Sequence, residues 1–222
     1  MRELNVVTPV HGRLLVDEAP EGGPLRLLVG FHGYAQNAEE MMEMLRAIPI
    51  GRSWTRVSVQ GLHRFYRSRS EVTVASWMTR QDRDTLIDDN VHYVDAAIDA
   101  AAGARAIERL VLCGFSQGAA MAYRAAVLGA RWPDAVIGAC GDVPPELFDE
   151  AAGYTWPRVL LARGTRDDYY TAEKMRANDA SLADAGAHVE TFTFEGAHEW
   201  TKECATRAAD FIASSFGQGI KP

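Results

Sequence analysis

Short apolar runs alternate with helical segments along almost the whole chain, and this order is the strongest constraint on its fold. Apolar runs typical of buried strands occupy residues 25–31, 54–59, 110–113, 135–139, 158–162 and 188–194. Between them, helical patterns cover residues 37–48, 84–103, 118–128, 171–185 and 201–216. Parallel strands need such helical crossovers, so the order predicts an α/β fold with a mostly parallel central sheet and helices on both faces.

Two stretches depart from this alternation. Residues 61–80 have no clean period and are rich in arginine and serine, so we expect a loop there. Residues 1–17 alternate weakly around Val6, Val7, Leu14 and Val16, which favours an antiparallel hairpin at one edge of the sheet. No linker interrupts the pattern, so residues 1–222 are expected to form a single domain.

Charge and hydropathy limit the partners that the chain can have. Its formal net charge is -7 and its pI is about 5.4, so nucleic acid is not an expected partner. Arg64, Arg67 and Arg69 are interpreted as part of a solvated loop, with an anionic substrate group as the alternative. No apolar run is long enough for a membrane span and the N-terminus lacks a signal-peptide pattern. These features predict a cytoplasmic protein without integral membrane association.

The cysteines give no sign of a metal site or a disulfide framework. Cys113, Cys140 and Cys204 are odd in number and widely spaced, without a CxxC pair. We expect all three to be reduced core residues. No metal and no organic cofactor is expected.

The run Gly114-Phe115-Ser116-Gln117-Gly118 matches G-x-S-x-G and lies between an apolar strand and a helix. Glycines on both sides let the chain turn sharply, and the turn exposes the serine hydroxyl above the following helix. Ser116 is therefore the candidate nucleophile. An ordinary glycine-rich turn between strand and helix is the alternative interpretation.

A second polar feature, His32-Gly33-Tyr34, follows the first strong strand. Acyl transfer builds negative charge on a carbonyl oxygen, which two backbone N–H groups can stabilise. In this type of fold one N–H comes from the residue after the nucleophile, here Gln117, and the other from this early loop, here Tyr34. His32 is expected to shape the loop through hydrogen bonds rather than to act as a base.

A carboxylate and a histidine follow later strands, in the order that such a site needs. Asp167 and Asp168 follow the strand ending at Gly164, and either is able to orient a histidine or to cap the next helix. His198 follows the last strand and is the candidate general base. The chain order serine, aspartate, histidine is the one used by hydrolases with this strand and helix order.

Taken together, FHGYAQNAEEM, GFSQGAAMA, RGTRDDYYTAEKM and FEGAHEW resemble the phospholipase/carboxylesterase family of small α/β-hydrolases, which includes the acyl-protein thioesterases. The resemblance covers roughly residues 25–211 and implies the α/β-hydrolase fold with a minimal cap. In that family the catalytic aspartate lies three residues after a glycine, which here selects Asp167. The implied site residues are Ser116, Asp167 and His198, with oxyanion N–H groups from Tyr34 and Gln117.

Departures from the family pattern concern the substrate. Arg163 stands where many relatives have histidine, and Ala35 replaces a glycine. Asp168 and the aromatic pair Tyr169-Tyr170 follow the aspartate, where relatives often have a proline and small apolar residues. Aromatic residues near the motifs are candidates to line an acyl or alcohol pocket, with ordinary packing as the alternative. The candidate substrate-binding residues are Phe65, Tyr66, Trp77 and Tyr169.

These observations predict a serine hydrolase that cleaves carboxylic esters or thioesters of small to medium acyl chains, as carboxylesterases and lysophospholipases do. The alternatives are a noncatalytic binding protein of the same fold and a serine peptidase. The expected partner is a small-molecule ester or thioester. The sequence leaves open whether the chain pairs into a homodimer.

Overall fold

A computed structural model describes residues 1–149 and 153–217 of the chain. Its main sheet contains β1 (Arg13–Asp17), β2 (Leu25–Phe31), β3 (Trp54–Gln60), β6 (Ile107–Phe115), β7 (Ala135–Ala139), β8 (Arg158–Gly164) and β9 (Val189–Phe194). They lie in the order β1-β3-β2-β6-β7-β8-β9. Every neighbouring pair is parallel except β1 and β3. The mostly parallel sheet predicted from the sequence is confirmed.

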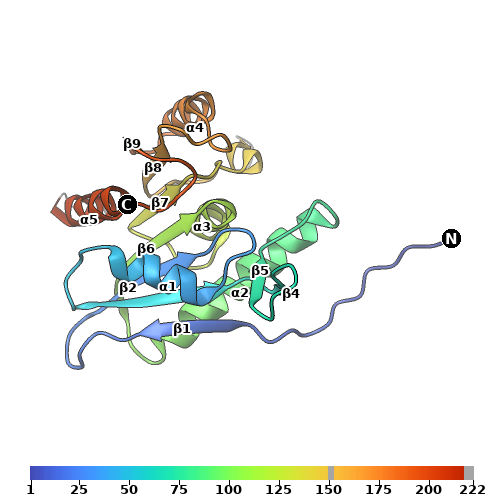
Figure 1. The fold of residues 1–222 in the computed structure, drawn as a ribbon. Helices are drawn as coiled ribbons and strands as arrows, with labels where there is room; N and C mark the ends of the chain where they lie inside the picture. Colours follow the sequence, from blue (N-terminus) through green and yellow to red (C-terminus); the bar gives the residue numbers. More distant parts are fainter. Residues whose placement is uncertain (150–152, 218–222) are drawn as a thin grey trace.

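Helices cover both faces of this sheet (Figure 1). One layer contains α1 (Ala38–Ala47) and α5 (Lys202–Gly217); the other contains α2 (Arg83–Ala102), α3 (Gln117–Leu128) and α4 (Ala172–Asp184). A 3₁₀ turn, η1 (Pro145–Phe148), follows β7. The layers arise because side chains of β2 alternate: Leu27 and Val29 join the core under α2 and α3, and Leu28 joins the core under α1 and α5.

The segment expected to be a loop, residues 61–80, instead contains a small antiparallel hairpin. Its strands are β4 (His63–Tyr66) and β5 (Thr73–Ser76). The hairpin is tied to the chain after β2, because Ala35 N–H donates to Ala75 O at 3.0 Å and Ala75 N–H donates to Gln36 O at 2.8 Å. Four-residue strands leave little periodic signal, and the chain after β2, to which the hairpin is bonded, is distant in sequence.

An antiparallel strand lies at one edge of the sheet as expected, but it does not form the expected N-terminal hairpin. Residues 1–12 form no strand, and β1 pairs antiparallel with β3 rather than with a neighbour in sequence. The open edge of β3 offers a complete ladder of backbone partners, so local alternation in residues 1–17 did not identify the true pairing. Among the described residues, no helix has both the length and the apolar character to cross a bilayer.

Candidate active site

The turn between β6 and α3 places Ser116 at the carboxyl end of the sheet. Ser116 has φ 54° and ψ -120°, a strained conformation of the kind found at functional turns. Its N–H donates to Ala139 O at 2.8 Å, which ties the turn to β7. A Cβ on Gly114 would lie 2.2 Å from Gly118 O, and one on Gly118 would lie 2.0 Å from Phe31 O. The tight turn therefore requires glycine at both flanking positions.

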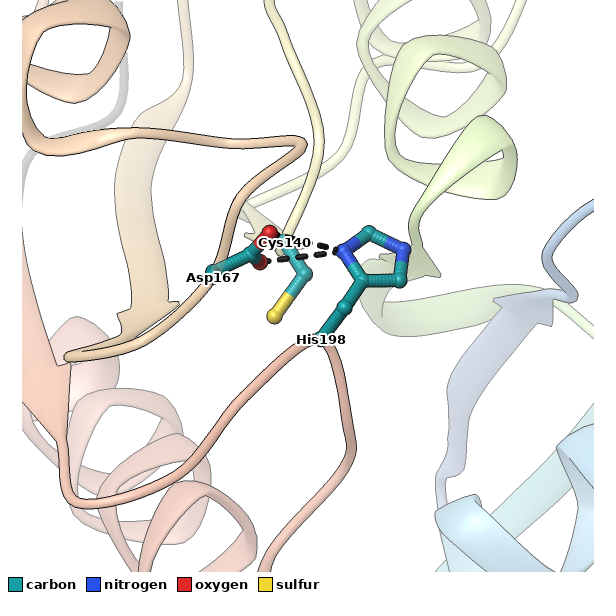
Figure 2. A group of neighbouring side chains, drawn as sticks. All are labelled: Cys140, Asp167 and His198. Carbon is teal, nitrogen blue, oxygen red and sulfur yellow. Dashed lines mark hydrogen bonds and ion pairs between the residues drawn. The ribbon is translucent and has the colours of Figure 1, made fainter.

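His198 lies on the loop after β9, between Ser116 and Asp167. Its Nε2 is 2.8 Å from Ser116 Oγ, and its Nδ1 is 3.0 Å from each carboxylate oxygen of Asp167. Figure 2 shows the imidazole facing the carboxylate. A carboxylate only accepts, so Nδ1 carries the proton and the Nε2 lone pair faces the serine hydroxyl. In this tautomer His198 is able to take the serine proton.

The structure distinguishes the two adjacent aspartates that the residue pattern left open. Asp167 is 3% exposed, and its Oδ1 accepts hydrogen bonds from the N–H groups of Tyr169 and Tyr170, each at 2.9 Å. Asp168 is exposed to solvent. A Cβ on Gly164 would lie 2.2 Å from Ala197 O, so glycine at that position lets the aspartate loop and the histidine loop approach. Asp167 is the aspartate beside His198.

The charge on Asp167 is stabilised despite its burial. Burial alone would raise the pKa of this carboxyl, but hydrogen bonds from the Tyr170 N–H, from His198, from the Cys140 thiol and from the Tyr169 N–H hold that pKa below its usual value. Asp167 is consequently ionised at neutral pH. An ionised partner stabilises a protonated imidazole.

The loop after β2 lies against the nucleophile. A Cβ on Gly33 would be 3.2 Å from Ser116 Cβ, and the Gly33 N–H donates to Gln36 Oε1 at 2.7 Å. His32 is fully buried; its Nδ1 is 2.7 Å from Gly33 O, and its Nε2 accepts from the Gly61 N–H at 3.0 Å. Burial lowers the pKa of His32, which therefore remains neutral. Its contacts agree with the predicted role in shaping the loop.

The side chain of Gln117 fastens the segment after β5 to the start of α3. Its Oε1 accepts from the Trp77 N–H at 3.0 Å, and its Nε2 donates to Met78 O at 3.1 Å. The backbone N–H of Gln117 lies in the first turn of α3, next to the Ser116 hydroxyl. That the N–H groups of Gln117 and Tyr34 bind an oxyanion stays a prediction.

Among the predicted pocket residues, the structure separates one from the rest. Trp77 is 0% exposed and donates from Nε1 to His32 O at 2.8 Å. Its assignment to a substrate pocket is wrong, because it packs in the core beneath the loop after β2. Tyr66 is exposed on the hairpin, and Phe65 lies 5.6 Å from the exposed ring of Tyr34.

The ring of Tyr169 lies 5.0 Å from the imidazole of His198 and is 73% exposed. Phe115 contacts the same imidazole at 5.3 Å. Tyr34 and Tyr169 thus come from the loops after β2 and β8 and are both available to solvent near the reacting groups. Of the predicted pocket residues, Phe65, Tyr66 and Tyr169 stay predictions, and the exposed ring of Tyr34 lies beside Phe65.

The sequence did not identify two residues that place polar groups near the site, Gln36 and Cys140. Gln36 was treated only as part of a motif, although its side chain holds the Gly33 N–H. Cys140 is a free core cysteine as predicted, but its Sγ also lies within 4.8 Å of ligand atoms of Asp167 and His198, which was not expected. No local pattern marks either residue: the partner of the Gln36 side chain is a backbone N–H three residues away, and the neighbours of Cys140 are far away in sequence.

The cluster of Cys140, Asp167 and His198 has the spacing of a potential metal site. Its donors are already engaged with one another: Nδ1 of His198 is bonded to both Asp167 oxygens, and Oδ1 accepts two backbone N–H groups as well. A metal ion would have to displace these hydrogen bonds. The geometry fits a hydrogen-bonded acid and base better than a metal centre.

A separate hollow of about 330 Å³ lies at the opposite end of the strands. It is bordered by Ile50, Trp54 and Phe216, with the Arg109 guanidinium 4.8 Å from the centre of the Phe216 ring. Its described lining residues include no serine, cysteine or histidine. The chemistry therefore points to the carboxyl end of the sheet, around Ser116.

Comparison with known proteins agrees with this fold. The family model described as acetyl xylan esterase (AXE1) matches residues 6–140. Similar solved structures include esterase PE8 (TM-score 0.71, 20% identity, 94% of this chain and 100% of that chain), Zea mays acyl-protein thioesterase 2 (0.69, 19%, 92% and 99%) and the Bacillus cereus carboxylesterase (0.71, 16%, 92% and 95%). No curated protein sequence matches significantly. The predicted α/β-hydrolase fold and the resemblance to small esterases and acyl-protein thioesterases are confirmed.

Proposed function

This chain belongs to the acetyl xylan esterase (AXE1) family, and from that premise we propose that it hydrolyses carboxylic esters with Ser116 as the nucleophile. His198 serves as general base and acid, and Asp167 orients the imidazole. The N–H groups of Gln117 and Tyr34 bind the oxyanion. The reaction needs neither a metal nor an organic cofactor.

One observation carries the proposal: the hydrogen-bonded line from Ser116 Oγ through His198 to the buried Asp167, with distances of 2.8 and 3.0 Å. Each residue follows a different strand of the sheet, β6, β8 or β9, so distant segments converge on a single line. The serine has a positive φ of 54°, a strained conformation of the kind that clusters at functional sites. This combination supports acyl transfer rather than ligand binding alone.

In the first step, the Ser116 proton moves to His198 Nε2 as Oγ attacks the carbonyl carbon. The carbonyl oxygen becomes an oxyanion, stabilised by the two backbone N–H groups, each contributing about 3 kcal/mol. His198 Nε2 then returns the proton to the leaving alcohol oxygen. The bond between the carbonyl carbon and the leaving oxygen breaks, and an acyl-enzyme remains on Ser116.

In the second step, His198 takes a proton from water, and the hydroxide attacks the acyl carbon. Collapse of the second tetrahedral intermediate releases the carboxylic acid, and the proton returns to Ser116 Oγ. The low pKa of Asp167 keeps it ionised throughout, so it stabilises the imidazolium without accepting a proton.

The surroundings of Ser116 favour small to medium acyl groups and a leaving group with a flat face. Tyr34 and Tyr169 present exposed rings near the serine, and Phe65 supports the ring of Tyr34. Exposed aromatic rings stack on sugar or aryl groups at little entropic cost. Acetyl esters of xylan, named by the family, are the first natural substrates to try. Thioesters are the second, since the same attack applies to them.

The test is hydrolysis of a p-nitrophenyl ester series from acetate to palmitate, with acetylated xylan and an acyl thioester in parallel. Wild type is compared with Ser116→Ala and with the matched control Ser214→Ala, a serine on the α5 helix far from the site. A fluorophosphonate probe labels the nucleophile in each protein. We expect turnover and labelling in wild type and control, and neither in Ser116→Ala.

The chain-length profile then defines the acyl preference, and the comparison of ester with thioester defines the leaving group. A folded wild type that neither hydrolyses nor takes the label would overturn the proposal. Equal labelling of wild type and Ser116→Ala would instead assign the nucleophile to another residue.

A further inference from the structure

Trp77 is bound at three polar atoms by three separate parts of the chain. Its backbone N–H donates to Gln117 Oε1 at 3.0 Å, and its indole N–H donates to His32 O at 2.8 Å. Its carbonyl oxygen accepts from Asn90 Nδ2 on α2 at 2.7 Å. The side chain is fully buried, and its ring lies 5.6 Å from the ring of Phe31 and 5.3 Å from the imidazole of His32. The two N–H groups of Trp77 therefore join the start of α3 to the loop after β2.

His32 in turn orients the peptide bond between Gly33 and Tyr34. Its Nε2 accepts from the Gly61 N–H at 3.0 Å, so the proton of this neutral imidazole lies on Nδ1, which donates to Gly33 O at 2.7 Å. The Gln36 N–H donates to the same oxygen at 3.2 Å. In a trans peptide the C=O and N–H groups point in opposite directions. The two donors on Gly33 O consequently direct the Tyr34 N–H to the side opposite them.

The side chain of Gln117 connects Trp77 to the nucleophile turn. Gln117 directly follows Ser116, and its backbone N–H is the other proposed oxyanion donor. Its Oε1 accepts from the Trp77 N–H, and its Nε2 donates to Met78 O at 3.1 Å. A line of hydrogen bonds from Gln117 through Trp77 to His32 thus joins the residue that carries one N–H group to the residue that orients the other.

We propose that Trp77 is a positioning residue, which holds the N–H groups of Gln117 and Tyr34 at the separation that one oxyanion needs. The two groups follow different strands, β6 and β2, and each stabilises an oxyanion only at about 2.7–3.1 Å from the oxygen. A small displacement of either loop is therefore enough to weaken the pair. Trp77 acts only through Gln117 and His32, and the inference rests on the proposed ester hydrolysis and its oxyanion donors.

Trp77→Phe tests this line, because it removes the indole N–H and keeps an aromatic ring in the core. The matched control is Trp156→Phe, the same change at a buried tryptophan whose Nε1 has no hydrogen-bond partner in the part of the chain that the structure describes. In hydrolysis of p-nitrophenyl acetate, we expect Trp77→Phe to lower kcat about tenfold with KM within about twofold of wild type, since the oxyanion exists only in the transition state. Trp156→Phe should keep the wild-type kcat and KM.

Gln117→Leu cuts the opposite end of the same line and leaves the backbone N–H of this residue in place. We expect it to lower kcat about tenfold as well, with an unchanged KM. Once one end of the line is free, loss of the other end has little further effect, so the double variant should stay within about threefold of the less active single variant. Two independent packing defects would instead multiply, to a loss of about a hundredfold.

Hydrogen exchange tests the same contact without substrate. The Gly61 N–H donates to His32 Nε2, so release of His32 should speed the exchange of the Gly61 amide. We expect this exchange to be about tenfold faster in Trp77→Phe, relative to the amides of β6, and unchanged in Trp156→Phe. A folded wild type that hydrolyses no ester would refute the proposed function, and this measurement would still decide whether Trp77 holds His32.

A folded Trp77→Phe variant that keeps at least about half of the wild-type kcat would overturn the proposal. Unchanged exchange at Gly61, or a double variant whose loss equals the product of the two single losses, would overturn it as well. If Trp77→Phe does not fold, Gln117→Leu decides alone: a wild-type kcat would overturn the proposal, and a loss of about tenfold with an unchanged KM would support it.

Discussion

Replacement of Asp167 by asparagine changes a single atom of the proposed site and has a large expected effect. The asparagine oxygen is able to keep the hydrogen bonds from the N–H groups of Tyr169 and Tyr170, which bind Oδ1 in the wild type. The amide NH₂ then faces Nδ1 of His198, where the second carboxylate oxygen lies 3.0 Å away. This amide donor beside Nδ1 favours the tautomer in which Nδ1 accepts and the proton lies on Nε2.

In that tautomer Nε2 donates to Ser116 Oγ, 2.8 Å away, and is unable to take the serine proton. Loss of the correct tautomer lowers kcat about 10⁴-fold in serine hydrolases of this geometry. At about 1.4 kcal/mol per tenfold, this is a barrier increase of about 5 kcal/mol. The fold should survive, because the variant keeps the volume and the turn hydrogen bonds.

The assay is steady-state hydrolysis of p-nitrophenyl acetate by wild type, Asp167→Asn and the matched control Asp168→Asn. The control carries the same chemical change one residue away, on an exposed side chain, and should stay within twofold of wild type. If Asp167→Asn retains more than a tenth of the wild-type kcat, or if Asp168→Asn is the damaged variant, the assigned hydrogen-bond line is wrong.

The same variant should alter the pH dependence of stability. The folded-state pKa of Asp167 lies below its usual value, so the unfolded chain takes up the proton first as the pH falls. The resulting stabilisation is complete above the unfolded pKa of about 3.9 and is lost as the pH falls through the folded-state pKa. Urea unfolding should show a difference between wild type and Asp167→Asn at pH 7 that shrinks at and below about pH 3. A difference independent of pH would contradict the lowered pKa.

Two further substitutions test the turn and the role of Tyr169. Gly118→Ala places a Cβ 2.0 Å from the backbone oxygen of Phe31, and should lower the free energy of unfolding by about 3 kcal/mol in urea titrations. The control Gly23→Ala, with open space around its Cβ, should change the free energy of unfolding by less than about 0.5 kcal/mol. Equal effects of the two substitutions would refute the close approach. Tyr169→Ala should raise KM for p-nitrophenyl esters threefold to tenfold, because it removes the ring beside the imidazole. The control Trp132→Ala, which removes an exposed aromatic side chain elsewhere, should leave KM unchanged. An unchanged KM for Tyr169→Ala would show that Tyr169 does not contact the substrate.

Much of the fold follows from local patterns. The buried strands of the parallel sheet and the helices between them each carry a period that depends only on which faces are buried, so their positions agree with the sequence to within a few residues. The hairpin β4–β5 and the pairing of β1 with β3 did not follow. The strands of the hairpin are only four residues long, which is too short for a clear period, and β1 pairs with a strand far away in the chain.

Some residues of the site also followed from local sequence patterns, whereas others did not. Ser116 and His198 stand out because each follows a strand in a recognisable motif, and the family resemblance selected Asp167. The residue pattern alone did not choose between Asp167 and Asp168, because burial and the direction of a side chain are properties of the folded loop. Trp77 illustrates the opposite error: an aromatic residue near the motifs in sequence is buried beneath them in space.

By itself, the sequence determined the alternation of the parallel strands with their helices and the presence of a serine on a glycine-flanked turn, since periodicity and backbone sterics are local. Only the tertiary structure decided which aspartate meets His198, where Trp77 packs and that Cys140 lies beneath the acid and base. Cys140, Asp167 and His198 follow β7, β8 and β9, and Trp77 contacts the loop after β2, so all these contacts join residues that are tens of positions apart. Their approach is set by the packing of the whole sheet, and no short stretch of sequence records it.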